Sequence, residues 1–322
     1  MIQPKIQDAD LKLQKKFLVI GYGVTGQLIA NELRQYGQVI ITDIKDVQNL
    51  HSSTSDFTYI KYSRGESFLT DLVSFLNTSF EAIVHTYLGN KQDVETIINQ
   101  LQPGVTKHFT TLGTLMTYDQ NSWQKIDAET GSFWNKYQYD KLIAEQMLLL
   151  YCNKNDISLY IPETFHILGS GFGVGIVGPH FRMNQASLKE YTALPKIILS
   201  GNSPKVWIDN QDFARMIASG IYHGVAGYQS IFSPNAVTPI EYYTVLDRVL
   251  GLEREIEIAI DISANPKCMN QSWVPTFSTI QNYNYTSLQS SLESAVKYLK
   301  DDQNPTTRNI YKIMSESLIL KL

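Results

Sequence analysis

The chain has 322 residues, of which 43% are hydrophobic and 18% are charged, so it can bury one large core or the cores of two interleaved domains. The net charge of -4 at pH 7 excludes a strongly basic surface of the kind that attracts nucleic acid or an anionic membrane. Cys152 and Cys268 share no short spacing, which fits a reducing cytoplasm better than a disulfide framework. The first apolar run, residues 17–20, is too short for a signal peptide or a membrane span. We therefore expect a soluble cytoplasmic protein with no nucleic-acid or membrane partner.

A glycine-rich turn follows the first predicted strand. Residues 17–20, FLVI, form an unbroken apolar run, as in a strand buried on both faces. GYGVTG follows directly, residues 27–37 predict a helix that ends at Gly37, and residues 38–43 predict a second strand that ends in Asp43. Strand, glycine turn, helix, strand and terminal acid together form the dinucleotide-binding unit of a Rossmann fold.

Each residue type in this unit has a physical task. Gly21 permits the tight turn, Gly23 lets the backbone approach a pyrophosphate, and Gly26 lets the helix pack closely on the strand. The N-terminus of the helix presents free N–H groups to the phosphates. Asp43 can accept a hydrogen bond from a ribose hydroxyl and would repel the 2′-phosphate of NADP, whereas Lys45 could tolerate that phosphate. We expect NAD as the cofactor and keep NADP as an alternative.

The alternation of strands and helices continues through the next hundred residues. It predicts a doubly wound, parallel α/β sheet of Rossmann type. The further strands are expected at 57–62, 81–88, 106–113 and 156–162, and the helices at 67–77, 91–102 and 137–153.

The segment NKYQYDKLIAEQ places Tyr137 and Lys141 four residues apart, on one face of the predicted helix, with Glu145 one turn further along. This Y-x-x-x-K-x-x-x-E pattern, downstream of a glycine-rich nucleotide loop, resembles the extended short-chain dehydrogenase/reductase superfamily, which includes NAD-dependent epimerases and dehydratases. The resemblance runs over nearly the full chain. It implies a third catalytic group at Thr114 in TLGTLMTYD, four residues before Tyr118.

The resemblance gives these three side chains one chemical task. Moving a hydride between a carbinol and a nicotinamide also requires moving the hydroxyl proton. A free tyrosine has a pKa of about 10, and a nearby ammonium such as Lys141 would favour the phenolate. Tyr137 would then act as general base or acid, Thr114 would orient the substrate oxygen, and Lys141 would also bind the nicotinamide ribose. The alternative is an interface tyrosine beside a solvated lysine.

The segment YIPETFHILGSG (160–171) is similar to the family segment that passes the nicotinamide and reaches the substrate. By that match Thr164 and Phe165 lie near the nicotinamide. His166 takes a place often held by a substrate-binding Asn, although an ordinary loop histidine explains it equally well. Glu163 stands where the family usually has Arg.

The segment KVWIDNQDFARMI (205–217) is similar to a strand-to-helix junction of the family. Lys205 replaces an Arg that grips a diphosphate in the nucleotide-sugar enzymes, which keeps the charge but loses the bidentate fork. Asp212 is expected to cap the helix that follows. Further elements are expected as a helix at 239–251, a strand at 255–260 and a last helix at 285–301.

These matches predict two interleaved domains. The NAD-binding domain is expected at 16–165 with about 203–225, and a smaller substrate-binding domain at about 166–202 and 226–322. The predicted cofactor contacts are Gly21, Tyr22, Gly23, Val24, Thr25, Gly26, Asp43, His85, Thr86, Tyr137, Lys141, Thr164 and Phe165. The predicted substrate contacts are Thr114, His166 and Lys205. No His, Cys and acid cluster has metal-ligand spacing, so no metal is expected.

The function ranked first is an NAD(P)-dependent oxidoreductase that acts on a carbinol or ketone carbon through Thr114, Tyr137 and Lys141. A dehydratase is disfavoured, because Leu115 and Met116 stand where family dehydratases carry two acids. A nucleotide-sugar epimerase is ranked slightly lower, since the diphosphate clamp is weakened. A non-catalytic NAD(P)-binding regulatory protein is the alternative from another class. The expected partner is a small molecule, either a nucleotide sugar or another carbonyl compound, and a homodimer is left open.

Overall fold

The computed structural model describes most of the chain but not all of it. The described residues are 15–44, 57–62, 69, 79–101, 104–119, 121–131, 136–171, 185–199, 201–258, 274–275 and 279–300. Of the predicted helix at 67–77, only Leu69 falls among them, and it is helical.

The main sheet of the protein is parallel and doubly wound. In the part of the chain that the structure describes it has eight strands, seven of them in the order β11-β7-β5-β4-β1-β2-β3, with β6 paired to β7. All pairs along that order are parallel. The strands are β1 (Lys16–Ile20), β2 (Gln38–Asp43), β3 (Thr58–Lys61), β4 (Ala82–His85), β5 (His108–Thr111), β6 (Gly113–Thr114), β7 (Ser158–Thr164) and β11 (Gly227–Ser230). The predicted α/β class is confirmed.

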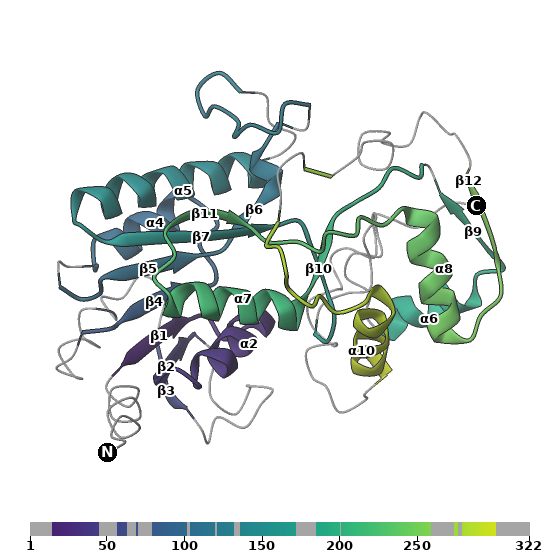
Figure 1. Ribbon diagram of the computed structural model, residues 1–322, viewed down its shortest axis with the longest axis horizontal. Coiled ribbons are helices and arrows are strands. Elements are labelled where there is room, and N and C mark those ends of the chain that lie inside the picture. The colour runs from purple at the N-terminus through teal and green to yellow at the C-terminus, as the bar shows by residue number, and fades with distance from the viewer. Residues whose placement is uncertain are drawn as a thin grey trace, which may run out of the picture. The chain divides into compact units, whose positions relative to one another are not determined.

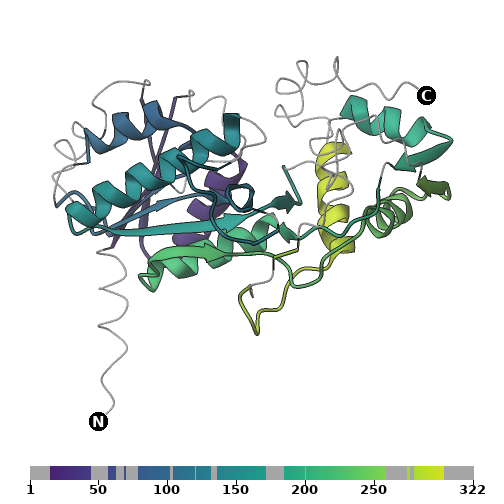
Figure 2. The same cartoon turned by 90° about the horizontal axis from the view of Figure 1, so that it is seen from above.

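Helices cover both faces of this sheet, which explains the unbroken apolar runs in its strands. The helices are α2 (Val24–Leu33), α4 (Lys91–Ile98), α5 (Lys136–Lys154) and α7 (Asn210–Tyr222). Figures 1 and 2 show α4 and α5 on one face of the sheet and α2 and α7 on the other. Leu18, Ile83 and Phe109 of the strands share one buried cluster with Val94 of α4 and Leu148 of α5.

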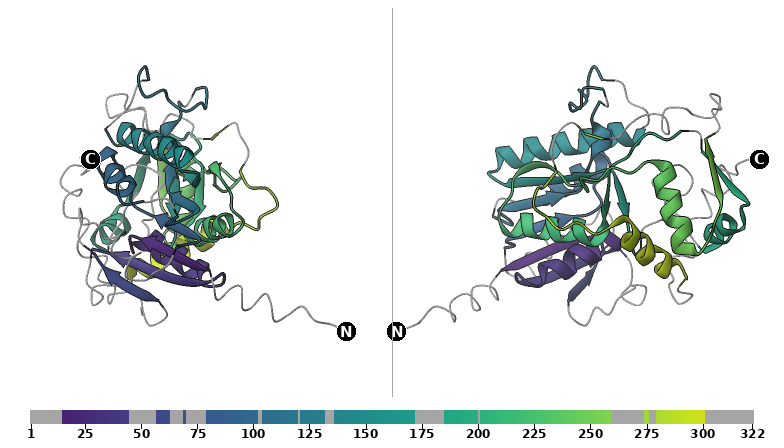
Figure 3. Two further views of the ribbon diagram at one scale, coloured as in Figure 1. Left: turned by 90° about the vertical axis from the view of Figure 1, so that its left-hand side faces the viewer. Right: turned by 45° about the vertical axis from the view of Figure 1, so that its right-hand side comes forward.

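A second set of elements has its own core. It comprises β8 (His166–Leu168), α6 (Gln185–Ala193), β9 (Lys196–Leu199), β10 (Trp207–Asp209), α8 (Pro239–Leu250), β12 (Glu255–Ile258) and α10 (Leu288–Lys300). Strand β8 pairs with β10, and β9 pairs with β12, both in parallel. Figure 3 shows α8 beside α10, and Leu246 and Leu292 lie in one apolar cluster with Trp207.

The contacts divide the chain into two compact units. The first comprises Met1–Glu163 and Ala214–Ser230, and the second comprises Thr164–Phe213 and Ile231–Leu322. Each unit is assembled from two separate segments of the chain, and two stretches lie outside the boundaries expected from the sequence. Residues 203–213 belong to the second unit because Lys205 exchanges backbone hydrogen bonds with Val237 and β10 pairs with β8. Residues 227–230 belong to the first unit because β11 pairs with β7.

The start of α7 corrects one prediction. Asp209, not Asp212, holds the first turn: its Oδ1 accepts hydrogen bonds from the amides of Gln211 (2.9 Å) and Asp212 (3.3 Å). The Asp212 carboxylate instead accepts from the Thr286 amide (2.6 Å) and the Tyr283 hydroxyl (3.1 Å). The helix begins at Asn210, so Asp212 is already inside it and is available to hold the segment before α10.

The remaining predicted elements within the described ranges are present, most of them with bounds that differ by a few residues. The predicted strand at 81–88 ends at His85, the helix at 91–102 ends at Ile98, and the last helix begins at Leu288. Among the helices described, none is long and apolar enough to cross a membrane.

Candidate functional site

The winding of the main sheet reverses between β1 and β4. From β1 the chain adds β2 and β3 on one side, and then β4, β5 and β7 on the other. In open α/β sheets, ligands bind outside the carboxyl ends of the strands at such a switch point. Here the Gly21 amide donates to Thr42 O (2.8 Å) and the Thr86 amide donates to Ile20 O (3.0 Å), so the three strand ends are in register.

The glycine turn after β1 is held by close backbone contacts. Gly21 has a φ of 92°, and the Thr86 hydroxyl donates to the carbonyls of Ile20 (3.1 Å) and Gly21 (3.0 Å). A Cβ on Gly26 would lie 2.0 Å from the Gly21 carbonyl oxygen, so only glycine lets α2 approach the turn. A Cβ on Gly23 would meet nothing within 4 Å.

Gly23 is also the N-cap of α2, where no side chain caps the helix amides. No N-cap side chain therefore occupies the backbone N–H groups of the first turn, which includes Val24 and Thr25. This arrangement fits a pyrophosphate, which such helix ends bind through their N–H groups and dipole.

Asp43 ends β2 and is fixed in place by the glycine turn. Its Oδ2 accepts a hydrogen bond from the Tyr22 amide (2.6 Å), and its side chain is buried. The Tyr22 ring is buried as well and meets Phe57 edge-on at 6.2 Å between ring centroids. The carboxylate thus stands beside the turn, where it can serve a ribose hydroxyl. Lys45, which could tolerate the 2′-phosphate of NADP, lies outside the described residues.

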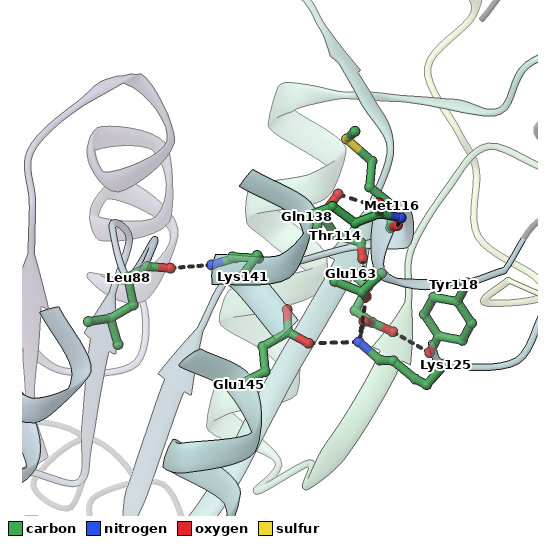
Figure 4. A network of polar contacts seen from close by, with 10 residues as sticks. Leu88, Thr114, Met116, Tyr118, Lys125, Gln138, Lys141, Glu145 and Glu163 are labelled. Carbon is green, nitrogen blue, oxygen red and sulfur yellow. Dashed lines mark hydrogen bonds and ion pairs between the residues drawn. The ribbon is translucent and has the colours of Figure 1, made fainter. Parts of the chain in front are cut away.

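The loop after β4 connects the switch point to α5. The buried His85 accepts a hydrogen bond from the Tyr87 amide at Nδ1 (3.2 Å). The Lys141 ammonium is buried and donates to Leu88 O (2.5 Å), as Figure 4 shows. Burial lowers the pKa of Lys141, and the Glu145 carboxylate one turn along the helix acts in the opposite direction.

Thr114 lies at the end of β6, at the start of a single 3-10 turn, Leu115–Thr117. Its hydroxyl accepts a hydrogen bond from the Met116 amide (3.3 Å). The Gln138 amide group on α5 donates to Met116 O and so joins this turn to the helix. Gln138 is 0% exposed, whereas its neighbour Tyr137 is 51% exposed. In Figure 4 the Lys141 ammonium points toward Leu88 and away from Thr114.

A charged cluster with two buried acids, which the sequence patterns did not reveal, lies next to this turn. The Lys125 ammonium donates to Glu163 Oε1 (2.6 Å), Glu145 Oε2 (2.7 Å) and Thr117 Oγ1 (2.7 Å). The Tyr118 hydroxyl donates to the other oxygen of Glu163 (2.7 Å). Glu145 is 1% and Glu163 0% exposed. We call these five residues the Lys125 cluster, and Figure 4 labels Tyr118, Lys125, Glu145 and Glu163.

The cluster perturbs one of its own acids. Burial and the Glu145 charge raise the pKa of Glu163 to about 7, while Lys125 acts to lower it. Two buried carboxylates require a cation, and both acids were visible in the sequence. Nothing in the spacing pointed to Lys125, which lies in a turn region between predicted elements.

The remaining predicted residues lie in the second unit. Thr164 is buried, and Phe165 packs its ring edge-on against His166 at 4.2 Å between centroids. Burial and the nearby Lys205 charge lower the pKa of His166 to about 3, so this imidazole is neutral at physiological pH. Lys205 is itself buried. The structure thus brings His166 and Lys205 together, as a neutral ring beside a cation.

Within the described ranges, no three His, Cys, Asp or Glu side chains come together in a way that could hold a metal ion.

No protein-family model matches the sequence, and no curated protein matches it. Solved structures do share its fold. One is the enzyme WbmH of Bordetella bronchiseptica in complex with NAD+, at 17% identity and a TM-score of 0.65, covering 90% of this chain and 99% of that one. Another is a putative epimerase from Burkholderia cenocepacia J2315, at 17% identity and 0.69, covering 89% and 99%.

A third similar structure is the UDP-N-acetylglucosamine 4-epimerase from Methanobrevibacter ruminantium M1 in complex with UDP-N-acetylmuramic acid. Its identity is 14% and its TM-score 0.68, with 89% of this chain and 98% of that chain covered. At these identities the likeness establishes the fold. The chain has the fold of these proteins over nine-tenths of its length.

Proposed function

We propose that this chain is an NAD-dependent enzyme that transiently oxidises a carbinol carbon of a nucleotide sugar and acts as an epimerase. The observation that carries the proposal is the glycine turn at the switch point, where the uncapped end of α2 and the Asp43 carboxylate lie side by side. The epimerases among the similar structures support this choice. We therefore rank the epimerase above the dehydrogenase or reductase. This reverses the order expected from the sequence, where Lys205 in place of a diphosphate-binding Arg favoured the oxidoreductase.

The first unit offers a suitable group for three parts of NAD, the pyrophosphate and the two riboses. The α2 amides beside Gly23 suit the pyrophosphate, and Asp43 suits the hydroxyls of the adenine ribose. Lys141 uses one N–H on Leu88 O and retains two donors for the nicotinamide ribose. Bound NAD would supply the hydride acceptor, and protein side chains would transfer the proton.

Tyr137 is the proposed general base and acid. When a hydride leaves a carbinol carbon, the hydroxyl proton must pass to a base, and in an epimerase the same group returns it. Tyr137 is half-exposed in the first turn of α5, one turn from the Lys141 ammonium. A cation at that position favours the phenolate, and Glu145 in turn favours the protonated form of Lys141. The Thr114 hydroxyl would orient the substrate oxygen.

A net dehydrogenase or reductase remains the second candidate. It is favoured by Lys205, whose single buried ammonium is a weaker grip on a diphosphate than a bidentate Arg. An epimerase must hold its substrate while the transient ketone rotates in the site and presents its other face to the hydride. A net redox enzyme has no such requirement.

We predict that the protein binds NAD+ about tenfold or more tightly than NADP+, because the Asp43 charge opposes the 2′-phosphate. Asp43→Asn should bring the two dissociation constants closer together. Isothermal titration with both cofactors measures this. Asp156→Asn, an exposed change just before the amino end of β7, is the matched control and should leave the ratio unchanged. Tighter binding of NADPH than of NADH would contradict the assignment of Asp43.

We predict that Tyr137→Phe lowers kcat by about 10²- to 10⁴-fold and leaves the Kd for NAD+ within about twofold, because the phenol oxygen is needed only for proton transfer. Lys141→Met should weaken NAD+ binding as well as turnover. Tyr139→Phe, the same change two residues along α5 at another exposed tyrosine, is the control. Wild-type turnover by Tyr137→Phe would remove Tyr137 from the mechanism.

The reaction type is tested by stoichiometry. With a panel of UDP-sugars and bound NAD+, we expect a 4-epimer product with no net change in the absorbance of reduced nicotinamide. One equivalent of reduced cofactor per product would instead establish a dehydrogenase. Tight NAD+ binding without turnover of any panel member would favour the non-catalytic regulatory alternative.

A further inference from the structure

We propose that Lys125 is a positioning residue for this reaction, which fixes Thr114 relative to α5 through a chain of hydrogen bonds. The inference rests on the proposed function for its effect on turnover. The role of Lys125 in ordering the Thr114–Thr117 turn is a separate structural claim and can be tested without any substrate.

The chain of hydrogen bonds is continuous and directional. The Lys125 ammonium donates to Thr117 Oγ1 (2.7 Å), and the Thr117 hydroxyl donates to the Thr114 carbonyl (2.7 Å). A Lys ammonium has three N–H donors, and here they go to Thr117, to Glu145 and to Glu163. All three N–H donors of the ammonium are therefore used, and the three acceptors fix its orientation.

These three partners come from three elements that carry proposed site residues. Thr117 belongs to the turn that begins at Thr114, and Glu145 lies on α5, one turn beyond Lys141. Glu163 is next to the end of β7, and the chain continues from it into Thr164 and Phe165. A single cation thus ties the turn, the helix and the strand to one another.

The environment of Lys125 holds the ammonium in this position. The ring centroids of Tyr118 and Tyr228 lie 4.9 Å and 4.2 Å from its Nζ, which suits a cation–π contact with each ring. Without Lys125, the buried Glu145 and Glu163 would lose the cation that both contact, and an unpaired carboxylate is costly to bury. Glu145 already has one oxygen, Oε1, with no hydrogen-bond partner among the described residues.

Two of the NAD contacts proposed above, the α2 amides and Asp43, lie elsewhere, at the ends of β1 and β2, and the third, Lys141, is held by its own hydrogen bond to Leu88 O. Loss of Lys125 should therefore affect turnover far more than cofactor affinity. Small displacements of a catalytic hydroxyl are sufficient, because a misplacement of about 1 Å can cost about 10²-fold in rate.

The cluster also has a consequence for stability that involves no substrate. The folded protein retains a proton on Glu163 up to a pKa of about 7, whereas the unfolded chain loses it near 4.5. The contribution of this group to the free energy of unfolding is therefore greatest below pH of about 4.5, falls as the pH rises to about 7, and then levels off. The charged or titratable groups that face Glu163 are Tyr118, Lys125, Lys141, Glu145 and Tyr228.

We predict that Glu163→Gln removes this fall, so the stability of the variant relative to the wild type increases as the pH rises from about 5 to about 7. Urea titrations at several pH values measure the difference. Glu253→Gln, at an exposed position, is the control and should show no such trend. A difference for Glu163→Gln that is independent of pH across this range would contradict the raised pKa assigned to Glu163.

The positioning role is tested with two variants that break the chain at different links. Thr117→Val removes the relay hydroxyl and leaves every charge in place. Lys125→Met combined with Glu163→Gln removes the ammonium and one acid together, which limits the burial of uncompensated charge. The controls are Thr110→Val, where the buried hydroxyl has no hydrogen-bond partner among the described residues, and Lys107→Met at an exposed site.

For each full-length variant, we would measure amide hydrogen exchange of the segment 114–118, the Kd for NAD+, and kcat and KM with the UDP-sugar that the wild type turns over. Both test variants should exchange faster in this segment and lose about tenfold or more in kcat, with KM and Kd within about twofold and the controls unchanged. Unchanged exchange in both variants overturns the proposal, as does unchanged kcat. If the wild type turns over no UDP-sugar, the proposed function fails, and the exchange data alone decide whether Lys125 orders the turn.

Discussion

The parallel pairing of β1 with β2 and β4 is the constraint on which the candidate site depends. It brings Ile20 opposite Thr42 and His85, so three strands end at the same level. The residues that follow, Gly21 and Thr86, then meet through the hydrogen bonds of the Thr86 hydroxyl. The glycine turn, the N-terminus of α2 and Asp43 are all placed by this register. The site therefore follows from backbone geometry before any side chain contributes its chemistry.

A second constraint is electrostatic. The resemblance to the extended short-chain dehydrogenase/reductases predicts Arg where this chain has Glu163, which places a second carboxylate beside Glu145. The structure supplies the missing positive charge from another segment, as Lys125. The charge balance of the region is thus restored by a residue that the family pattern does not mark, and this connects the Thr114 turn with α5.

The sequence predicted most of what is encoded locally. The glycine turn, the buried strands and the helix at 136–154 follow from short-range patterns of apolar residues and glycine, and the structure has them. The sequence predicted that Asp212 caps α7, but Asp209 does so. Either acid is a good helix cap, and the choice depends on the residue at which the helix begins. Lys125 was missed because its partners are 20 and 38 residues away, beyond the reach of any local pattern.

The central claim is that a hydride leaves a carbinol carbon of the substrate and returns to it through bound NAD. Tyr137 takes the hydroxyl proton and later gives it back. This claim is tested most directly with a UDP-sugar that carries deuterium on that carbon, converted in ordinary water and analysed by NMR of the product. The account predicts that the product retains the deuterium at the same carbon with inverted configuration. Exchange of the label for solvent hydrogen would show that the carbon loses a proton instead, and would contradict the account.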